Sequence, residues 1–227
     1  MHKYIYICGK SCTGKDSIYH EIMSIISKTS EYEDIDFQIP FTTRPKRENE
    51  REGVEYHFVT DKDFNRMVLE DKFSSHESFK LADNSVVLYG QPKPDTTKNI
   101  HFKIATFTNV SEEIKLLSSN DEVFVFDIIL PATIHADRIY SRNINQKKPD
   151  WKEVIRRTLT DAEDFGERAC TSLKISLEES EPRCLFRYIS NSSSIQNSAY
   201  SIIFQLQAFG VLNTVSNISS ACIMNIT

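Results

Sequence analysis

The stretch CGKSCTGKDS, residues 8–17, contains most of a phosphate-binding loop. The general pattern is G-x-x-x-x-G-K-[ST]; Gly9, Gly14 and Lys15 match it, whereas Asp16 stands where a hydroxyl residue is usual. The preceding run KYIYIC is apolar and typical of a buried strand, and the following isoleucines recur at the spacing of one helical face. Taken alone, this imperfect match fits a simple glycine turn equally well, but a position between strand and helix favours phosphate binding.

In such a loop the backbone N–H groups and the helix N-terminus surround a phosphate chain, and Lys15 adds a point charge. Three roles remain open for the acid that follows. Asp16 could ligate Mg²⁺, Ser17 could take over part of that role, or Asp16 could only stabilise the positive helix end. The residues expected to bind the nucleotide are Gly9, Lys10, Ser11, Cys12, Thr13, Gly14, Lys15, Asp16 and Ser17.

Composition limits the classes of protein to consider. The 227 residues, 40% hydrophobic and 26% charged, suit one globular domain, and a net charge of -5 gives no general attraction for nucleic acid or anionic membranes. No apolar run approaches the roughly 20 residues of a membrane span, and the first residues are too short an apolar run for a signal peptide. Five scattered cysteines predict free thiols in a reducing cytoplasm.

The rest of the chain alternates between strand and helix patterns. Further apolar runs, IHFKIATF, EVFVFDIIL and CLFRYISN, are each followed by a segment with helical periodicity. This order predicts an α/β fold with a parallel sheet covered on both faces. The pattern weakens at residues 81–99, which we interpret as an extended or loop segment, and 211–227 show no periodicity.

A polar, basic segment, TTRPKRENEREGVEYHF, occupies residues 42–58. Arg44 and Arg47 lie three residues apart and Tyr56 follows nine further on, so two guanidinium forks and a phenol could clamp a phosphate dianion. Several glutamates are interspersed, and taken alone the segment fits a solvated charged loop better.

Together, the phosphate loop and residues 41–68 resemble the guanylate kinase family, in which T-T-R-x-x-R…Y-x-F binds the acceptor monophosphate. Four further segments follow in the family's order: LYGQ, FDIILPATIHADRIYSRN, WKEVIRRTLTDAEDF and RYISN. The resemblance implies a P-loop NTPase-type parallel sheet with helices on both faces. It also implies a domain over 1–209 with phosphate loop 9–16, monophosphate-binding segment about 36–100, lid about 135–150 and a loose tail, 210–227.

The resemblance also implies roles for individual side chains. The acceptor phosphate would be held by Arg44, Arg47, Tyr56 and Tyr89. Arg142, with Arg138, would come from the lid, and Lys15 would act on the transferring group. Arg156 or Arg157 would meet the same group, and only one of them is expected to face the site because they lie about 100° apart on one helix.

The sequence departs from the family at two functional positions. The family's acidic D-x-D after the third strand, which serves metal and base, is absent, and Lys103 and Thr106 stand in this region. Asp127 lies on the next strand and is interpreted as structural. The family reads guanine with a hydroxyl where this chain has Pro40 and with a glutamate where it has Ser75.

Glu77, two residues after Ser75, is then the expected reader of guanine, although an exposed acid without function fits the sequence equally well. The activity implied is transfer of the γ-phosphoryl group of ATP, with Mg²⁺, to GMP or dGMP by a monomer or homodimer. One alternative is another small phosphate acceptor, including a ribose bisphosphate. The other is a non-catalytic binding module, which the retained Lys15, Arg138 and Arg142 argue against.

Overall fold

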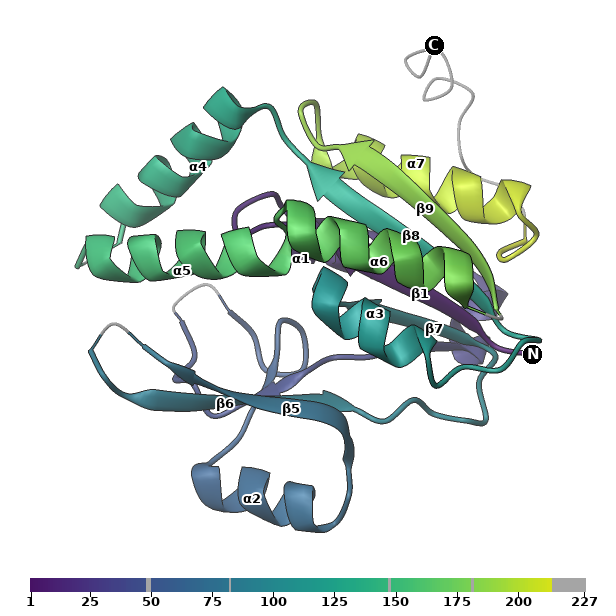
Figure 1. The fold of residues 1–227 in the computed structure, drawn as a ribbon, viewed down its shortest axis with the longest axis horizontal. Coiled ribbons are helices and arrows are strands. Elements are labelled where there is room, and N and C mark those ends of the chain that lie inside the picture. Colours follow the sequence, from purple (N-terminus) through teal and green to yellow (C-terminus); the bar gives the residue numbers. More distant parts are fainter. Residues whose placement is uncertain (48–49, 82, 147, 181, 214–227) are drawn as a thin grey trace.

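The computed structural model describes residues 1–47, 50–81, 83–146, 148–180 and 182–213. A five-stranded, wholly parallel sheet forms its centre (Figure 1). In sheet order the strands are β2 (Ile35–Phe37), β7 (Ile100–Ile104), β1 (Lys3–Cys8), β8 (Glu122–Ile129) and β9 (Arg183–Ser190). The predicted α/β class with a parallel sheet is confirmed.

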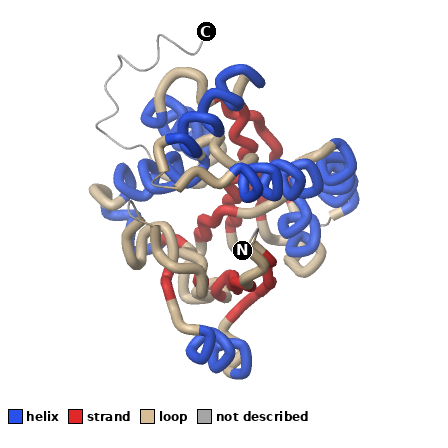
Figure 2. The backbone as a smooth tube through the Cα atoms, turned by 90° about the vertical axis from the view of Figure 1, so that its left-hand side faces the viewer, coloured by secondary structure: helices blue, strands red, loops and turns tan. Residues whose placement is uncertain are grey.

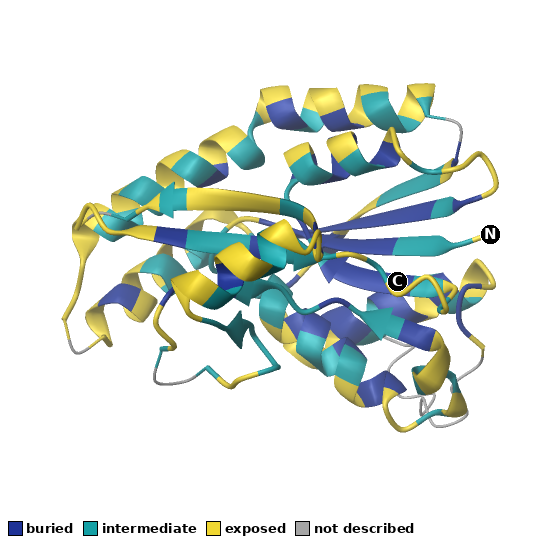
Figure 3. Ribbon diagram, turned by 90° about the horizontal axis from the view of Figure 1, so that it is seen from below, coloured by how far each residue is buried: buried dark blue, intermediate teal, exposed yellow. Residues whose placement is uncertain are grey.

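Helices cover both faces of this sheet, because its inner strands are apolar on both sides (Figure 3). Ile5 and Ile7 of β1 pack toward one pair of helices, while Tyr6 and Cys8 pack toward the other. The first pair is α1 (Lys15–Ile26) and α7 (Ile195–Ala208), and the second is α3 (Phe107–Ile114) and α6 (Glu167–Glu179). Helix α6 was not anticipated from the sequence.

A second, mixed sheet of four strands lies apart from the central one (Figures 1 and 2). Its strands, in order, are β4 (His57–Phe58), β3 (Phe41–Thr42), β6 (Val86–Pro92) and β5 (Phe73–Lys80). Helix α2 (Asp61–Leu69), capped by the Thr60 hydroxyl, packs below it through Phe64 on Phe73, with ring centroids 4.7 Å apart. Part of the interval interpreted as extended or loop, 81–99, is the regular strand β6.

Two helices form a projecting hairpin between β8 and α6 (Figure 1). They are α4 (Ala132–Ile144) and α5 (Trp151–Asp164). The Asp150 N–H donates to Asn143 Oδ1 at 2.9 Å across the turn, and the rings of Tyr140 and Trp151 lie 5.8 Å apart. The predicted lid, about 135–150, falls within this hairpin.

The boundary predicted for the C-terminal tail is too early. Val211 and Leu212 are buried against the central core, so a loose tail does not start at residue 210. A short 3₁₀ helix, Ser30–Asp34, is the remaining regular element of the described chain. Residues 214–227 lie outside the described part. No helix in that described part is long and apolar enough to cross a membrane.

Candidate active site

The phosphate loop follows β1 and takes three left-handed backbone positions. Gly9 has φ 147°, Cys12 φ 65° and Gly14 φ 93°. A Cβ on Gly14 would also lie 2.4 Å from Asn191 Nδ2, so a side chain is excluded by both backbone and space. Helix α1 begins at Lys15 with no side chain hydrogen-bonded to its first N–H groups, which leaves these donors available to an anion.

The carbonyl groups of the loop are held from the opposite side. Thr13 O accepts from Asn191 Nδ2 at 2.8 Å and from Arg138 Nη1 at 3.2 Å. Arg138 Nη2 also donates to Asn191 O at 3.0 Å, and the buried Thr13 hydroxyl donates to Lys10 O at 2.8 Å. Arg138 therefore supports the loop backbone from α4.

The acid that interrupts the usual pattern pairs with the loop lysine. Lys15 Nζ lies 3.5 Å from an oxygen of Asp16, whose side chain is 51% exposed. Ser17 is exposed as well. Among the described residues, no three His, Cys, Asp or Glu side chains lie together as a metal site. Mg²⁺ usually takes one or two carboxylates with the remaining ligands from phosphates and water, and Asp16 fits that limited role.

Arg44 is buried two residues after β3 of the small sheet, and most of its hydrogen-bond donors have partners. Its guanidinium makes a bidentate pair with Glu50, at 2.7 and 3.0 Å, and Nη1 also donates to Pro45 O at 2.7 Å. Nε donates to Tyr89 Oη at 3.2 Å, and the guanidinium carbon lies 5.5 Å from the centroid of the Tyr56 ring. Arg44 thus orients the phenol groups of Tyr56 and Tyr89, and few of its own donors are left for a phosphate.

Glu50 was not anticipated, although its place three residues after Arg47 is a recognisable pairing distance. It accepts from the Arg47 N–H at 2.8 Å and, at 3.4 Å, from Arg47 Nη1. With Arg44 already held, this carboxylate fixes the backbone between the two arginines. Arg44, Arg47 and Glu50, the predicted phosphate clamp, are therefore held by ion pairs and are not loosely solvated, whereas Arg51 and Glu52 are exposed.

Arg47 brings the clamp into a cluster of positive charge. Burial, and next the charge of Arg157 on α5, lower the pKa of Arg47 to about 10. Arg44 and Arg142 act in the same direction, while Glu50 opposes them. Positive charge from α4 and α5 thus acts on Arg47, and such a concentration of positive charge favours an anion.

Glu153 organises the arginines of α5. It accepts from Arg156 Nε and Nη2, each at 2.8 Å, and from Arg157 Nε at 2.8 Å. These hydrogen bonds, chiefly that of Arg156, hold the pKa of Glu153 near 2. We expected one of the two arginines to face the site, but the structure gathers both guanidinium groups on this single carboxylate.

The comparisons with known proteins agree with this geometry. A family model described as guanylate kinase matches residues 1–101. A protein of Syntrophotalea carbinolica named guanylate kinase is 41% identical over 170 residues, 69% of this chain and 68% of that protein. The chain belongs to the guanylate kinase family.

Two further relatives extend the guanylate kinase likeness. A protein of Malacoplasma penetrans named guanylate kinase is 28% identical over 183 residues, 78% of this chain and 81% of that protein. The crystal structure of guanylate kinase from Anaplasma phagocytophilum matches with a TM-score of 0.51, covering 93% of this chain and 88% of that one. At 14% identity, this last match supports the fold alone.

Lys103 and Thr106, which stand where the family's acids were expected from the sequence, have structural partners in this chain. Lys103 is buried and pairs with Glu113 at 2.5 Å, and Glu113 also accepts from the Tyr6 hydroxyl at 3.0 Å. Thr106 caps α3 by accepting from the Asn109 N–H at 3.2 Å. Neither side chain is therefore free to replace a carboxylate at the site.

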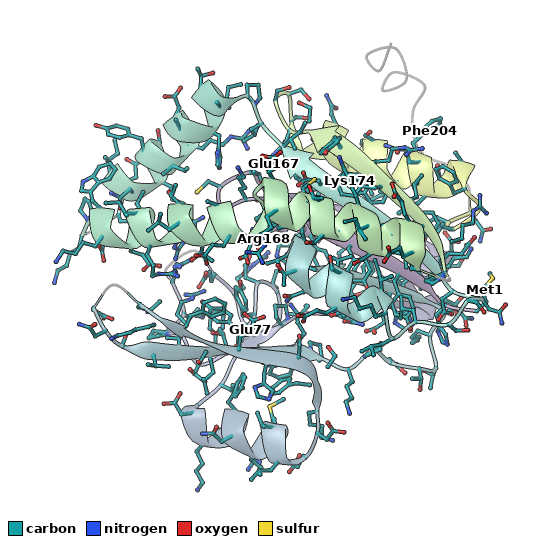
Figure 4. All side chains as sticks on the ribbon, viewed as in Figure 1. Met1, Glu77, Glu167, Arg168, Lys174 and Phe204 are labelled. Carbon is teal, nitrogen blue, oxygen red and sulfur yellow. The ribbon has the colours of Figure 1, made fainter. Side chains whose placement is uncertain are left out.

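Glu77 lies on β5, opposite Tyr89 on β6. Figure 4 shows it on the side of the small sheet that faces α5 and α6. Burial raises the pKa of Asp164, at the end of α5, to about 6, with the charges of Glu77 and then Asp161 adding to the effect. Glu77 is therefore an exposed residue of strand β5 on the side of the small sheet toward α5, and its role in reading guanine stays a prediction.

Asp127, interpreted from the sequence as structural, pairs in register with Cys8 at the end of β1, where the phosphate loop begins. Burial raises its pKa from 3.8 to about 6, although Lys10 opposes the shift. The folded protein thus holds this proton to higher pH than the unfolded chain. The free energy of unfolding of the protein therefore falls as the pH rises from about 4 to about 6, and it stays at the lower value above pH 6.

Asp127→Asn is expected to remove the decrease in stability that ionisation of Asp127 causes. At pH 8 the variant should be more stable than the wild type by about 1–3 kcal/mol, and near pH 4 the two should be equal. Urea unfolding at both pH values measures the difference, with Asp137→Asn, an exposed acid on α4, as the control. Equal stability of variant and wild type at pH 8 would contradict the raised pKa.

Proposed function

We propose that this chain transfers the γ-phosphoryl group of ATP to GMP or dGMP, giving ADP and the nucleoside diphosphate. The observation that carries the proposal is that positive charge from α4 and α5 acts on Arg47 beside the phosphate loop. Arg142 and Arg157 both lower the pKa of Arg47, Arg142 Nη1 lies 3.6 Å from Cys12 Sγ in the loop, and the helix after the loop has no side-chain cap on its first N–H groups. Phosphoryl transfer requires positioning of two nucleotides and stabilisation of charge on the equatorial oxygens. A cluster of arginines between two phosphate sites supports both requirements.

The donor and acceptor have separate sites in this proposal. The loop residues 9–17 hold the ATP phosphates, and Lys15 stabilises the charge that develops on the transferring group. Tyr56 and Tyr89, oriented by Arg44, hold the acceptor phosphate together with Arg47. Arg142 and the α5 pair, Arg156 and Arg157, then lie toward the group in transfer.

Mg²⁺ would supply charge neutralisation between the donor phosphates. Asp16 is the proposed protein ligand, directly or through water, with Ser17 nearby on α1. Asp16→Asn is expected to raise the Mg²⁺ concentration at half-maximal rate by about tenfold, because a carboxylate ligand is lost. A Mg²⁺ titration at saturating ATP measures this, with the exposed Asp34→Asn as the charge control. An unchanged titration would leave Asp16 only its role at the helix end.

Guanine is the proposed base because Glu77 can accept from its N1–H and N2–H₂ groups. The register of Glu77 opposite Tyr89 supports this, since it places the acid next to the acceptor clamp on the same face of the sheet. A site built on such pairing rejects a base that leaves its polar groups unpaired. Pro40 offers no side-chain hydrogen bond in the region where the family uses a hydroxyl.

The remaining features are proposed on the same basis. We infer work in the cytoplasm, as a monomer or homodimer, without nucleic acid or membrane partners. The cysteines of the described residues, Cys8, Cys12, Cys170 and Cys184, are free thiols, which suits a reducing compartment. The domain comprises the core, the small monophosphate-binding sheet and the lid hairpin.

A coupled ADP-release assay over a panel of acceptors tests the proposed function. The panel comprises GMP, dGMP, IMP, AMP, CMP, UMP and a ribose bisphosphate, each with ATP and Mg²⁺. The highest kcat/KM is expected for GMP or dGMP, with IMP weaker because it lacks the 2-amino group. A pyrimidine nucleotide or the sugar phosphate as best acceptor would overturn the guanine assignment, and no ADP release with any acceptor would overturn catalysis.

A further inference from the structure

Ser11, in the middle of the phosphate loop, is bound by both helices of the lid hairpin. Its N–H donates to the Asp161 carboxylate on α5, at 2.9 and 3.1 Å to the two oxygens. Its hydroxyl donates to the same carboxylate at 3.1 Å. Its carbonyl oxygen accepts from His135 Nε2 on α4 at 2.6 Å. Every polar group of Ser11 is thus engaged by the hairpin.

Asp161 is 9% exposed, and among the described residues the hydrogen bonds to its carboxylate all come from Ser11. A buried carboxylate is costly unless hydrogen bonds compensate it, and here the Ser11 donors do so. The contact therefore holds α5 against the loop at one defined position rather than as a loose surface pair.

Asp161 lies on the face of α5 that carries the cationic side chains. Glu153, Arg157 and Asp161 follow one another at intervals of four residues, which places them along one side of a helix. Four residues correspond to about 6 Å of helix axis. The contact between Asp161 and Ser11 consequently determines the distance between Arg157 and the phosphate loop.

We propose that Asp161 is a positioning residue, which fixes α5 on Ser11 so that Arg157 meets the phosphoryl group in transfer. The inference rests on the proposed function, because it assigns Arg157 to that group. A misplacement of about 1 Å at such a site can cost on the order of 10²-fold in rate. Asp161 itself touches neither nucleotide in this account and acts through the loop and through Arg157.

The variants Asp161→Ala and Asp161→Asn test this, with Glu163→Gln, an exposed acid on the same helix, as the matched control. The alanine variant is expected to lose about 10²-fold in kcat, while its affinity for ADP changes by less than about threefold. The asparagine variant is expected to recover most of the rate, because its carboxamide oxygen can still accept from Ser11. The control should match the wild type.

A double-mutant cycle with Arg157→Ala separates positioning from general stability. If Asp161 acts through Arg157, adding Asp161→Ala to Arg157→Ala should slow the enzyme by less than about threefold further. Losses that multiply, or an alanine variant with wild-type kcat, would overturn the proposal. If the alanine variant does not fold, the asparagine variant alone carries the test. An asparagine variant that is as slow as Arg157→Ala would overturn the proposal.

The two proposals fail in different ways. A wild-type protein without GMP kinase activity refutes the proposed function. A wild-type protein with that activity, combined with multiplying losses in the cycle, refutes the role of Asp161 alone.

Discussion

Lys15→Ala is expected to lower kcat for GMP phosphorylation by about 10²–10³-fold without unfolding the protein. The Lys15 ammonium lies at the start of α1, where it can stabilise the negative charge that develops on the oxygens of the transferred phosphoryl group. This ammonium pairs only loosely with Asp16, at 3.5 Å, so the loss of Lys15 removes little that supports the fold. Steady-state kinetics and thermal unfolding of the same preparations measure the two effects.

Lys28→Ala is the matched control for this prediction, because Lys28 is an exposed lysine just beyond the same helix. It should keep the wild-type rate. A Lys15→Ala variant that retains more than about half of the wild-type kcat would mean that the loop does not stabilise the transferring phosphate.

Arg47→Ala is expected to raise the KM for GMP by about 10–10²-fold, with a change of less than about threefold in the KM for ATP. The loss of a charged contact to a phosphate costs about 1.5–3 kcal/mol. Arg47 is better suited to this contact than Arg44, whose donors are mostly taken by Glu50, Pro45 and Tyr89. Initial rates with each nucleotide varied in turn separate the two constants.

Arg66→Ala serves as the control here, since Arg66 is exposed on α2 and pairs with Asp63 on its own helix. Its kinetics should match the wild type. Equal increases in both constants for Arg47→Ala would show that Arg47 does not belong to the acceptor site.

The elements that the sequence predicted well are those with strong local patterns. The apolar strand before Gly9, the isoleucines of α1 and the T-T-R segment are each readable within about 20 residues. They led to the parallel sheet, the phosphate loop and the guanylate kinase family, all of which stand.

The parts that were missed depend on partners distant in the chain or on weak patterns. Ser11 and Asp161 are 150 residues apart, and no spacing rule joins them. Glu153 could be seen as a helical partner of Arg156 and Arg157, but its effect on which of them faces the site depends on three-dimensional geometry. Strand β5 was missed because most of its residues are polar and exposed, which hides the alternation of a half-buried strand.

The departures from the family also became clearer in three dimensions. Lys103 and Thr106, which stand in the region of the family's acids, hold the core and cap a helix. The acids that surround the candidate site, Asp16, Glu77, Asp161 and Asp164, come from other elements of the fold. The residue types at single positions in the sequence therefore could not show which acids lie near the arginines of the site.

Transfer of label from [γ-³²P]ATP to GMP tests the central claim most directly. Purified protein, ATP, Mg²⁺ and GMP are incubated and the nucleotides are separated, with the Lys15→Ala variant as the parallel sample. Labelled GDP should form in step with ADP, at a rate that falls by about 10²–10³-fold in the variant. Label that appears only as inorganic phosphate, or labelled GDP formed equally fast by the variant, would contradict the account.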